Sequence, residues 1–246
     1  MVRSIGLVIC AVLGFASCQK PSACTSLSGS ATTTKELSLG SISELVINNG
    51  MSGTLHFDST LQESKVLVTG AENWIESVVV HDQGNRAEIE NQLSCKWIDP
   101  KDAFMYLDIY VPRLAYLEFS SGGEFVSEGV NKIEDFKYEQ WDCSGTMELN
   151  VECARSEYIF NTGPADLKVK GTTTHLNAFS NCEGKMDLGN LKAQTAYISQ
   201  NGLGTITVTV ATLLQGEIHD QGDIVYYGNP ELEVVAYSTG ELLKGQ

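Results

Sequence analysis

Four tyrosines recur along the C-terminal half of the chain at a spacing that could build a ligand-binding surface. They are Tyr116, Tyr138, Tyr158 and Tyr197, and the same series continues through Asn177, Gln215 and Glu233. Phenol rings beside amides form a platform on which sugar rings can stack and hydrogen bond, provided that the row faces solvent. The alternative interpretation is that the row packs inside the fold or under a corner loop.

The best local arrangement for enzymatic chemistry is Asp220 with Asp223, close to His219. Glycoside hydrolysis uses two carboxylates about 5–9.5 Å apart, but closely spaced acids are also typical of turns. The remaining histidines are scattered without the spacing of a metal site or a proton relay, and no GxSxG, Walker or HExxH motif occurs. We therefore expect a protein that is not an enzyme and has no metal or cofactor. A carbohydrate-active enzyme remains an alternative.

These residues belong to a sequence repeat of about twenty residues. The repeat is marked by small residues at intervals of 18 to 22 positions: Gly123, Gly145, Ala165, Gly184, Gly204, Gly222 and Gly240. Self-similarity at this period indicates a solenoid in which each repeat forms one coil and stacks on its neighbour. The segment "GDIVYYGNPEL" at Gly222 is then the last coil but one, and "TGELLKG" begins the last.

Two columns of residues test this register. Two positions after each small residue the side chain is always apolar, as an inward column requires: Phe125, Met147, Leu167, Met186, Ile206, Ile224 and Leu242. Three positions after it, Glu148, Lys168 and Asp187 follow one another in successive repeats. In parallel, in-register strands about 4.8 Å apart these opposite charges would be neighbours. The pattern predicts a parallel β-helix.

A second polar series lies three positions before the small residues and includes Asp142, Thr162, Asn181 and Asn201. We expect it to form a ladder of side-chain hydrogen bonds along a corner of the coil rather than a binding site.

The cysteines follow the same register. Cys143 and Cys182 would lie two coils apart, about 9.6 Å, which is too far for a disulfide. Cys182 is then expected to fill the core as a small apolar side chain. Apart from this excluded pair, the sequence leaves open the disulfide pairing among Cys24, Cys95, Cys143, Cys153 and Cys182.

Composition limits the partners. The 246 residues include 16 basic and 31 acidic side chains, which give a net charge of −15, and 42% are hydrophobic. This charge repels nucleic acid and anionic lipid surfaces, whereas the apolar content suffices for a sizeable core. We expect no nucleic-acid partner.

The N-terminus has the features of an export signal. Arg3 precedes an apolar segment, Ile5–Phe15, that is too short to span a bilayer, and "FASC" ends it. The run "LGFASCQK" resembles a bacterial lipoprotein signal, which implies lipid attachment at Cys18. Ordinary signal-peptide cleavage near Ala16 to Ser17 is the alternative. We divide the chain into a signal peptide at 1–17, a Ser/Thr-rich tether at 18–38 and one all-β domain at 39–246 with irregular first coils.

Several segments resemble the head GIN domain of putative auto-transporter adhesins, a bacterial domain of unknown function. They are "LVINNGMSGTLHF", "KVLVTGAENWIESVVV", "AEIEN", "YLDIYVPRLAYLEFSSGGEF" and the closing "GDIVYYGNPELEVVAYSTGELLK". The resemblance implies a right-handed parallel β-helix on an exported, often lipid-anchored protein. The middle repeats depart from the family pattern at "TGPA", Thr162 to Ala165, and at "NGLG", Asn201 to Gly204, and this departure concerns the local geometry of those coils rather than the fold.

Taken together, the sequence predicts an exported cell-envelope protein, an outer-membrane lipoprotein attached through its lipid alone, with an adhesin-like surface for a glycan or protein ligand. Whether it faces the periplasm or the exterior is left open. The alternative is a structural or protein-interaction module that forms homo-oligomers through an end coil, because end strands of a solenoid are unpaired.

Overall fold

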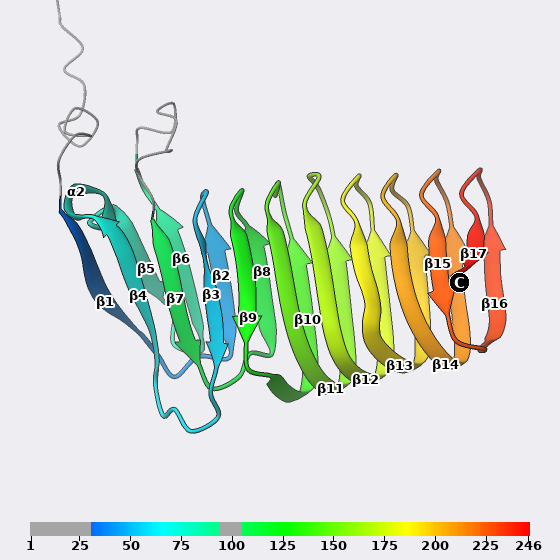
Figure 1. Ribbon diagram of the computed structural model, residues 1–246, viewed down its shortest axis with the longest axis horizontal. Coiled ribbons are helices and arrows are strands. Elements are labelled where there is room, and N and C mark those ends of the chain that lie inside the picture. The colour runs from blue at the N-terminus through cyan, green and yellow to red at the C-terminus, as the bar shows by residue number, and fades with distance from the viewer. Residues whose placement is uncertain (1–30, 94–104) are drawn as a thin grey trace, which may run out of the picture.

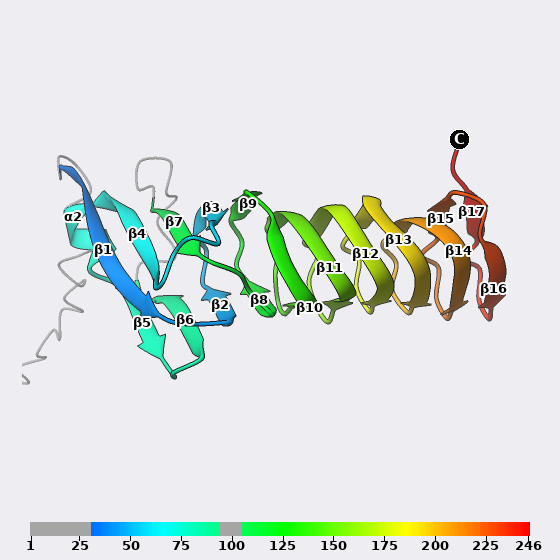
Figure 2. The same ribbon diagram turned by 90° about the horizontal axis from the view of Figure 1, so that it is seen from below.

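The chain winds into a stack of parallel strands that runs the length of the molecule (Figure 1). In the computed structural model, which describes residues 31–93 and 105–246, the coils are about 20 residues apart and 67% of the residues are in strands. In each coil, one strand segment precedes a tight turn and another follows it. We call the side formed by the segments before the turn face A, and the side formed by the segments after it face B. Long strands then bend around a third side back to face A (Figure 2). The predicted parallel β-helix is confirmed.

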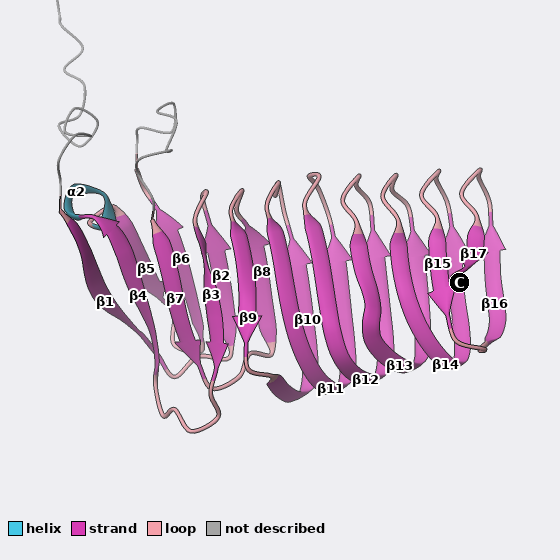
Figure 3. Ribbon diagram, viewed as in Figure 1, coloured by secondary structure: helices cyan, strands magenta, loops and turns pink. Residues whose placement is uncertain are grey.

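Face A contains, in spatial order, β5 (Val78–Asp82), β6 (Arg86–Asn91), β2 (Glu44–Asn48), β8 (Tyr116–Ser120), β10 (Asn131–Gln140), the C-terminal parts of β11 (Thr146–Phe160), β12 (Asp166–Ser180), β13 (Met186–Gln200) and β14 (Ile206–Ile218), and β16 (Glu231–Ala236). Face B contains β1 (Thr32–Gly40), β4 (Ser64–Ala71), β7 (Tyr106–Val111), β3 (Ser52–Phe57), β9 (Glu124–Glu128), the N-terminal parts of β11 to β14, β15 (Ile224–Tyr227) and β17 (Leu242–Lys244). A single helical turn, α2 (Glu72–Ile75), follows β4 (Figure 3).

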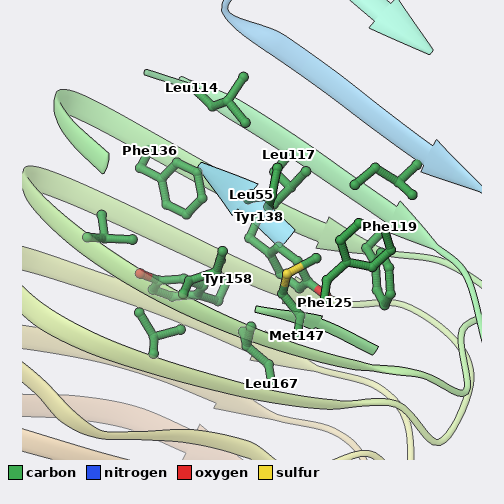
Figure 4. Close-up of a cluster of buried hydrophobic side chains, with 14 of the residues drawn as sticks. Leu55, Leu114, Leu117, Phe119, Phe125, Phe136, Tyr138, Met147, Tyr158 and Leu167 are labelled. Atoms are coloured by element: carbon green, nitrogen blue, oxygen red, sulfur yellow. The ribbon is translucent and has the colours of Figure 1, made fainter. Parts of the chain in front are cut away.

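The inward column has the predicted register. Phe125 aligns with Met147, Met147 with Leu167, and Leu167 with Met186, and the alignment continues to Leu242. All members from Phe125 to Ile224 are buried. Figure 4 shows three of them, Phe125, Met147 and Leu167, in the same cluster of buried side chains.

The outward charges also pair as predicted. Glu148 aligns with Lys168, and Lys168 with Asp187. The Lys168 Nζ lies 2.8 Å from Glu148 Oε1. Further ion pairs link residues twenty positions apart, including Lys132 with Glu152 and Arg155 with Asp135. The charged side chains on the outside of the coils therefore follow the same register as the apolar side chains inside.

The small residues that mark the repeat lie where successive turns touch backbone to backbone. A Cβ atom on Gly145 would lie 2.0 Å from the Gly123 carbonyl oxygen, and one on Gly204 would lie 1.9 Å from the Gly184 carbonyl oxygen. Distances this short leave no room for a side chain, so the repeat of small residues is a packing requirement.

The N-terminal coils are not stacked in the order of the sequence. The coil made by β2 and β3 lies between the coil of β6 and β7 and the coil of β8 and β9. Beyond β6 and β7, three strands run antiparallel: β5 on β6, β4 on β7, and β1 on β4. Together with α2, whose Trp74 and Ile75 are buried, they cover the N-terminal end of the core.

One expectation near the N-terminus needs correction. The tether expected over 18–38 is too long, because residues 32–38 belong to β1 and pair with β4. Its Thr-rich start has the composition of a linker, yet its β-branched residues and the alternation through Leu37 and Leu39 suit a strand. Residues 1–30, with the predicted signal peptide and Cys18, lie outside the described residues.

The described cysteines, Cys143, Cys153 and Cys182, are free, and Cys143 and Cys182 do not bridge each other, as predicted. Cys143 is buried, with its Sγ 2.9 Å from the Ser121 carbonyl oxygen, and Cys182 is half-buried against the core. Cys24 and Cys95 lie outside the described residues. Within residues 31–93 and 105–246, no helix has the length and apolar character needed to cross a bilayer.

Candidate functional site

The structure divides the predicted tyrosine row between the core and the surface. Tyr138 and Tyr158 have exposed fractions of 0%, and Figure 4 shows them among Phe119, Met147 and other buried side chains. Tyr116 and Tyr197 lie on the outside of face A. The expected continuous platform of four phenols is therefore wrong in its geometry, and the alternative of inside packing holds for two of them.

The reason is the length of two turns. On most coils the last inward residue of face A and the first inward residue of face B are six positions apart, as in Phe119 and Phe125. Gln140 and Met147 are seven positions apart, and so are Phe160 and Leu167. Successive side chains of a strand point in opposite directions, so one extra residue in the turn reverses which face-A side chains point inward. The residue seven positions before the small residue of the repeat is therefore outside on most coils and inside on these two.

The two buried phenols contribute to the core rather than to a binding surface. Tyr158 packs edge-on against Phe136 with ring centroids 6.2 Å apart, and Tyr138 lies 6.5 Å from Phe160. Neither hydroxyl has a hydrogen-bond partner among the described residues. Burial raises the pKa of both phenols well above the usual value for tyrosine.

Tyr116 is committed to a polar network on face A. Its Oη lies 2.9 Å from Glu118 Oε2 and 2.8 Å from Glu139 Oε2, and the Arg86 guanidinium lies over its ring. Burial, followed by the two neighbouring carboxylates, raises the pKa of the phenol. Because the hydroxyl and one ring face already have partners, Tyr116 is suited to holding three coils together.

Tyr197 is the member of the row that is available to a ligand. Its exposed fraction is 45%, and its hydroxyl has no partner among the described residues. It aligns with Asn177 on one side and with Gln215 on the other, so amides flank the phenol as the sequence analysis predicted. The amide of Gln215 also donates to Glu233.

Two apolar residues that the sequence analysis did not select extend this surface. Ile159 and Phe179 align with each other on neighbouring coils and are half-buried on the outside of face A. Phe179 lies two positions after Asn177, which is the ladder partner of Tyr197. We call Ile159, Phe179, Tyr197, Asn177 and Gln215 the face-A patch. The signal for the two missed residues was an apolar side chain at an outward position.

The predicted corner ladder is present as one link. Thr162 Oγ1 donates to Asp142 Oδ1 at 2.8 Å and accepts from the Asp142 backbone N–H at 2.9 Å. The side chain of Asn201 instead donates to Ser199 within its own coil. The ladder is interrupted because the longer turns at Asp142 and Thr162 differ in geometry from those that follow.

The candidate enzymatic residues serve the turns. Asp220 accepts a hydrogen bond from the Gln221 backbone N–H, and Asp223 accepts one from the Glu241 N–H. The His219 ring stacks on Tyr237 with centroids 5.0 Å apart. No group of three or more His, Cys, Asp or Glu residues that could hold a metal ion occurs in the part of the chain that the structure describes.

The geometry defines an extended β-solenoid whose regular coils display an aromatic and amide surface on a rigid side. The chain belongs to the family described as putative auto-transporter adhesin, head GIN domain, whose model matches residues 43–230. The resemblance noted from the sequence segments is thereby confirmed. No curated protein matches the chain.

Crystal structures of bacterial proteins share the fold. A putative adhesin from Bacteroides fragilis superposes with a TM-score of 0.81 at 18% identity, over 88% of this chain and 98% of that chain. A putative lipid binding protein from Parabacteroides distasonis gives 0.63 at 16% identity, over 89% and 98%. A putative adhesin from Parabacteroides merdae gives 0.61 at 13% identity, over 89% and 98%. The family and these neighbours support an adhesin-like role at the cell envelope.

Proposed function

We propose that this protein is an exported, lipid-anchored envelope protein without enzymatic activity that contacts a glycan through the face-A patch. The observation that carries the proposal is the exposed Tyr197 ring, which lies between the amides of Asn177 and Gln215 and has no polar partner among the described residues. Aromatic faces bind the apolar faces of sugar rings, and amides bind their hydroxyls. Membership in the adhesin family supports a binding role.

The absence of enzymatic activity is inferred from the roles of the acids. Asp220 and Asp223 hold backbone N–H groups in turns, and His219 is stacked on Tyr237. Release of reducing sugar from polysaccharides, lost in Asp220→Asn, would contradict this part of the proposal.

Glycan binding can be tested with a matched pair of tyrosine variants. A glycan array probed with the wild-type protein would identify ligands, and Tyr197→Ala is expected to weaken binding about tenfold or more, as for an aromatic anchor. Tyr227→Ala is the control, because Tyr227 is also exposed but lies on face B. Equal loss in both variants, or in neither, would contradict a role for the face-A patch.

The lipid anchor is inferred from the N-terminal signal and is tested separately. Cys18→Ala is expected to abolish incorporation of an alkyne-labelled fatty acid and to release the protein from the outer-membrane fraction. Cys24→Ala should change neither result. If Cys18→Ala still carries label, the anchor assignment is wrong, whereas the assignment of the face-A patch is unaffected.

A second candidate function is self-association through the C-terminal coil. Among the described strands β16 pairs only with β14, and Leu232, Val235 and Tyr237 have exposed fractions of 44%, 50% and 64%. An exposed apolar edge strand can pair with its copy about a two-fold axis. The N-terminal end of the same core is covered by antiparallel strands.

Self-association makes a prediction that is independent of any ligand. The net charge of −15 opposes contact between copies, so salt is expected to promote dimer formation in sedimentation experiments. Val235→Lys should prevent it, whereas Val126→Lys, at a similarly exposed position on face B, should not. A protein that stays monomeric at all salt concentrations would contradict this candidate.

A further inference from the structure

A cavity of about 520 Å³ lies at the lower corner of the N-terminal coils, away from the regular repeats. Three segments that are distant in sequence line it: the loop after β3, the turn between β7 and β8, and the start of β10, which Figure 1 shows at the bottom of the solenoid. The cavity lies where the coil of β2 and β3 is inserted out of order, so the usual coil-on-coil packing is interrupted. Its size is typical of small-molecule sites.

The backbone around this cavity is fixed before any ligand arrives. The buried Asn131 accepts the Leu114 N–H at 2.9 Å and donates to the Leu114 carbonyl at 2.8 Å. The Asp58 N–H donates to the Val111 carbonyl at 3.0 Å. Arg113 therefore lies in a turn whose backbone is hydrogen bonded at Val111 before it and at Leu114 after it. Lys132 directly follows Asn131, which makes the bonds to Leu114. A held frame lowers the entropic cost of ordering a site.

Arg113 has an unusual charge environment for this molecule. In a chain with 31 acidic residues, no carboxylate pairs with Arg113 within the described ranges, although the other two described arginines, Arg86 and Arg155, are both paired. The second cation of the cavity, Lys132, lies 2.8 Å from Glu152, but both side chains are largely exposed. An exposed pair of this kind is weak, so Lys132 can turn to a ligand at little cost.

The other residues that line the cavity provide a hydrogen-bond acceptor and apolar surface, which suit a ligand with hydroxyl groups. Asp58 Oδ1 accepts the Thr60 N–H at 2.9 Å and the Thr60 hydroxyl at 2.7 Å, and these bonds lower the pKa of Asp58. Asp58 therefore remains an ionised acceptor, with its second oxygen suited to a donor on the ligand. Apolar surface is supplied by Phe57, Leu61, Pro112 and Val130.

We propose that this cavity binds a carboxylate-bearing sugar of the uronic acid class. Arg113 would bind the carboxylate in a bidentate manner with help from Lys132, Asp58 would accept a hydroxyl, and the apolar wall would contact the ring. An isolated phosphate or sulfate would use the cations but would be repelled by Asp58 without the compensation that a hydroxyl donor provides. This site is separate from the face-A patch and does not depend on it.

The test uses D-galacturonate, with D-galactose as its neutral counterpart and inorganic phosphate as a simple anion. Binding to the complete folded domain is followed by NMR, with the backbone amides of Arg113 and Leu114 as local reporters. We expect saturable, salt-sensitive shifts with galacturonate, and little response to galactose. Arg113→Gln is expected to weaken binding at least tenfold, because the charge-assisted hydrogen bonds to the carboxylate are lost.

Two controls keep the test decisive. Lys192→Gln removes an exposed cation that has no ion pair among the described residues and lies outside the cavity, and it should leave galacturonate binding unchanged. Thermal unfolding of Arg113→Gln should match the wild type, because Arg113 is exposed. Equal binding of galactose, equal binding of phosphate, or retention of binding in Arg113→Gln would each overturn the proposal.

Discussion

The atoms next to a glycine determine whether a larger residue fits at that position of a turn. A Cβ atom on Gly204 would meet the carbonyl oxygens of Gly184 at 1.9 Å and of Glu183 at 2.6 Å. At Gly189, by contrast, the nearest contacts are the side chains of Asp187 and Thr207 at 3.1 and 3.2 Å, which can move. Gly204 is therefore required, because an added Cβ would clash with backbone atoms. Gly189 is not required, because only side chains would have to move.

Gly204→Ala is accordingly expected to lower the free energy of unfolding by roughly 1–3 kcal/mol or more, since overpacking against backbone cannot relax. Chemical denaturation would measure this. Gly189→Ala is the control and should change stability by less than about 1 kcal/mol. If the two variants are equally stable, the turns are not in backbone contact as described.

The buried phenols predict how stability depends on pH. Burial raises the pKa of Tyr138 and Tyr158 in the folded protein above the value near 10 of an unfolded chain. The folded state then holds these protons more tightly, so the stabilisation is complete below pH about 10 and is lost as the pH rises above it. Denaturation at pH 8 to 11 should show a falling free energy of unfolding.

The variants Tyr138→Phe and Tyr158→Phe separate this effect from a binding role. Each removes a hydroxyl without a partner among the described residues, so stability at pH 8 should be unchanged or higher by about 1 kcal/mol. The decline above pH 10 should become shallower. A loss of stability at pH 8 would show that the hydroxyls are hydrogen bonded after all.

At the scale of the element, turn length sets which residues face the core. The turns after Gln140 and Phe160 contain one more residue than the corresponding turns of the other regular coils. Each of the two includes a residue with positive φ, Asp142 at 46° and Gly163 at 96°. The extra residue explains why Tyr138 and Tyr158 are buried whereas Tyr197, at the same sequence offset, is exposed.

Deletion of Asp142 therefore has a larger expected effect than its substitution. Without the extra residue, either β10 or β11 must shift by one position and expose its apolar side chains, so we expect loss of cooperative folding or several kcal/mol of stability. Circular dichroism and thermal melting would show this. Asp142→Asn keeps the turn length and tolerates positive φ, and it should stay folded. Equal stability of both variants would disprove the explanation from turn length.

The strands of the regular coils were largely predictable from the sequence, whereas the turns between them were not. The inward column from Phe125 to Ile224 and the Glu148–Lys168 pair were predictable, because parallel stacking repeats the same contact every coil. The face-A patch was only half predictable. Counting positions from the small residues ignores turn length, which differs between the coils.

At the scale of the whole molecule, the order of the coils makes the two ends unequal. β2 pairs with β6 and β8, and β3 pairs with β7 and β9, so the first coil of the sequence is inside the stack. The C-terminal strands β16 and β17 pair on one side only, with β14 and β15.

Truncation from the two ends should therefore differ. Removal of residues 229–246 is expected to lower the melting temperature and leave a cooperative transition, because a solenoid loses end coils one at a time. Removal of residues 31–63 takes a coil from within the stack, and we expect the β-rich fold to be lost. Comparable melting curves for the two truncated proteins would contradict the observed coil order.

The sequence by itself determined the repeat, the parallel register, the stacked core and the charge pairs of the C-terminal coils, because those depend on contacts that recur at a fixed spacing. The tertiary structure decided the insertion of β2 and β3, the fate of each tyrosine and the cavity beside Arg113. These features arise from contacts between segments far apart in the chain and from turns of unequal length, and neither leaves a periodic signal.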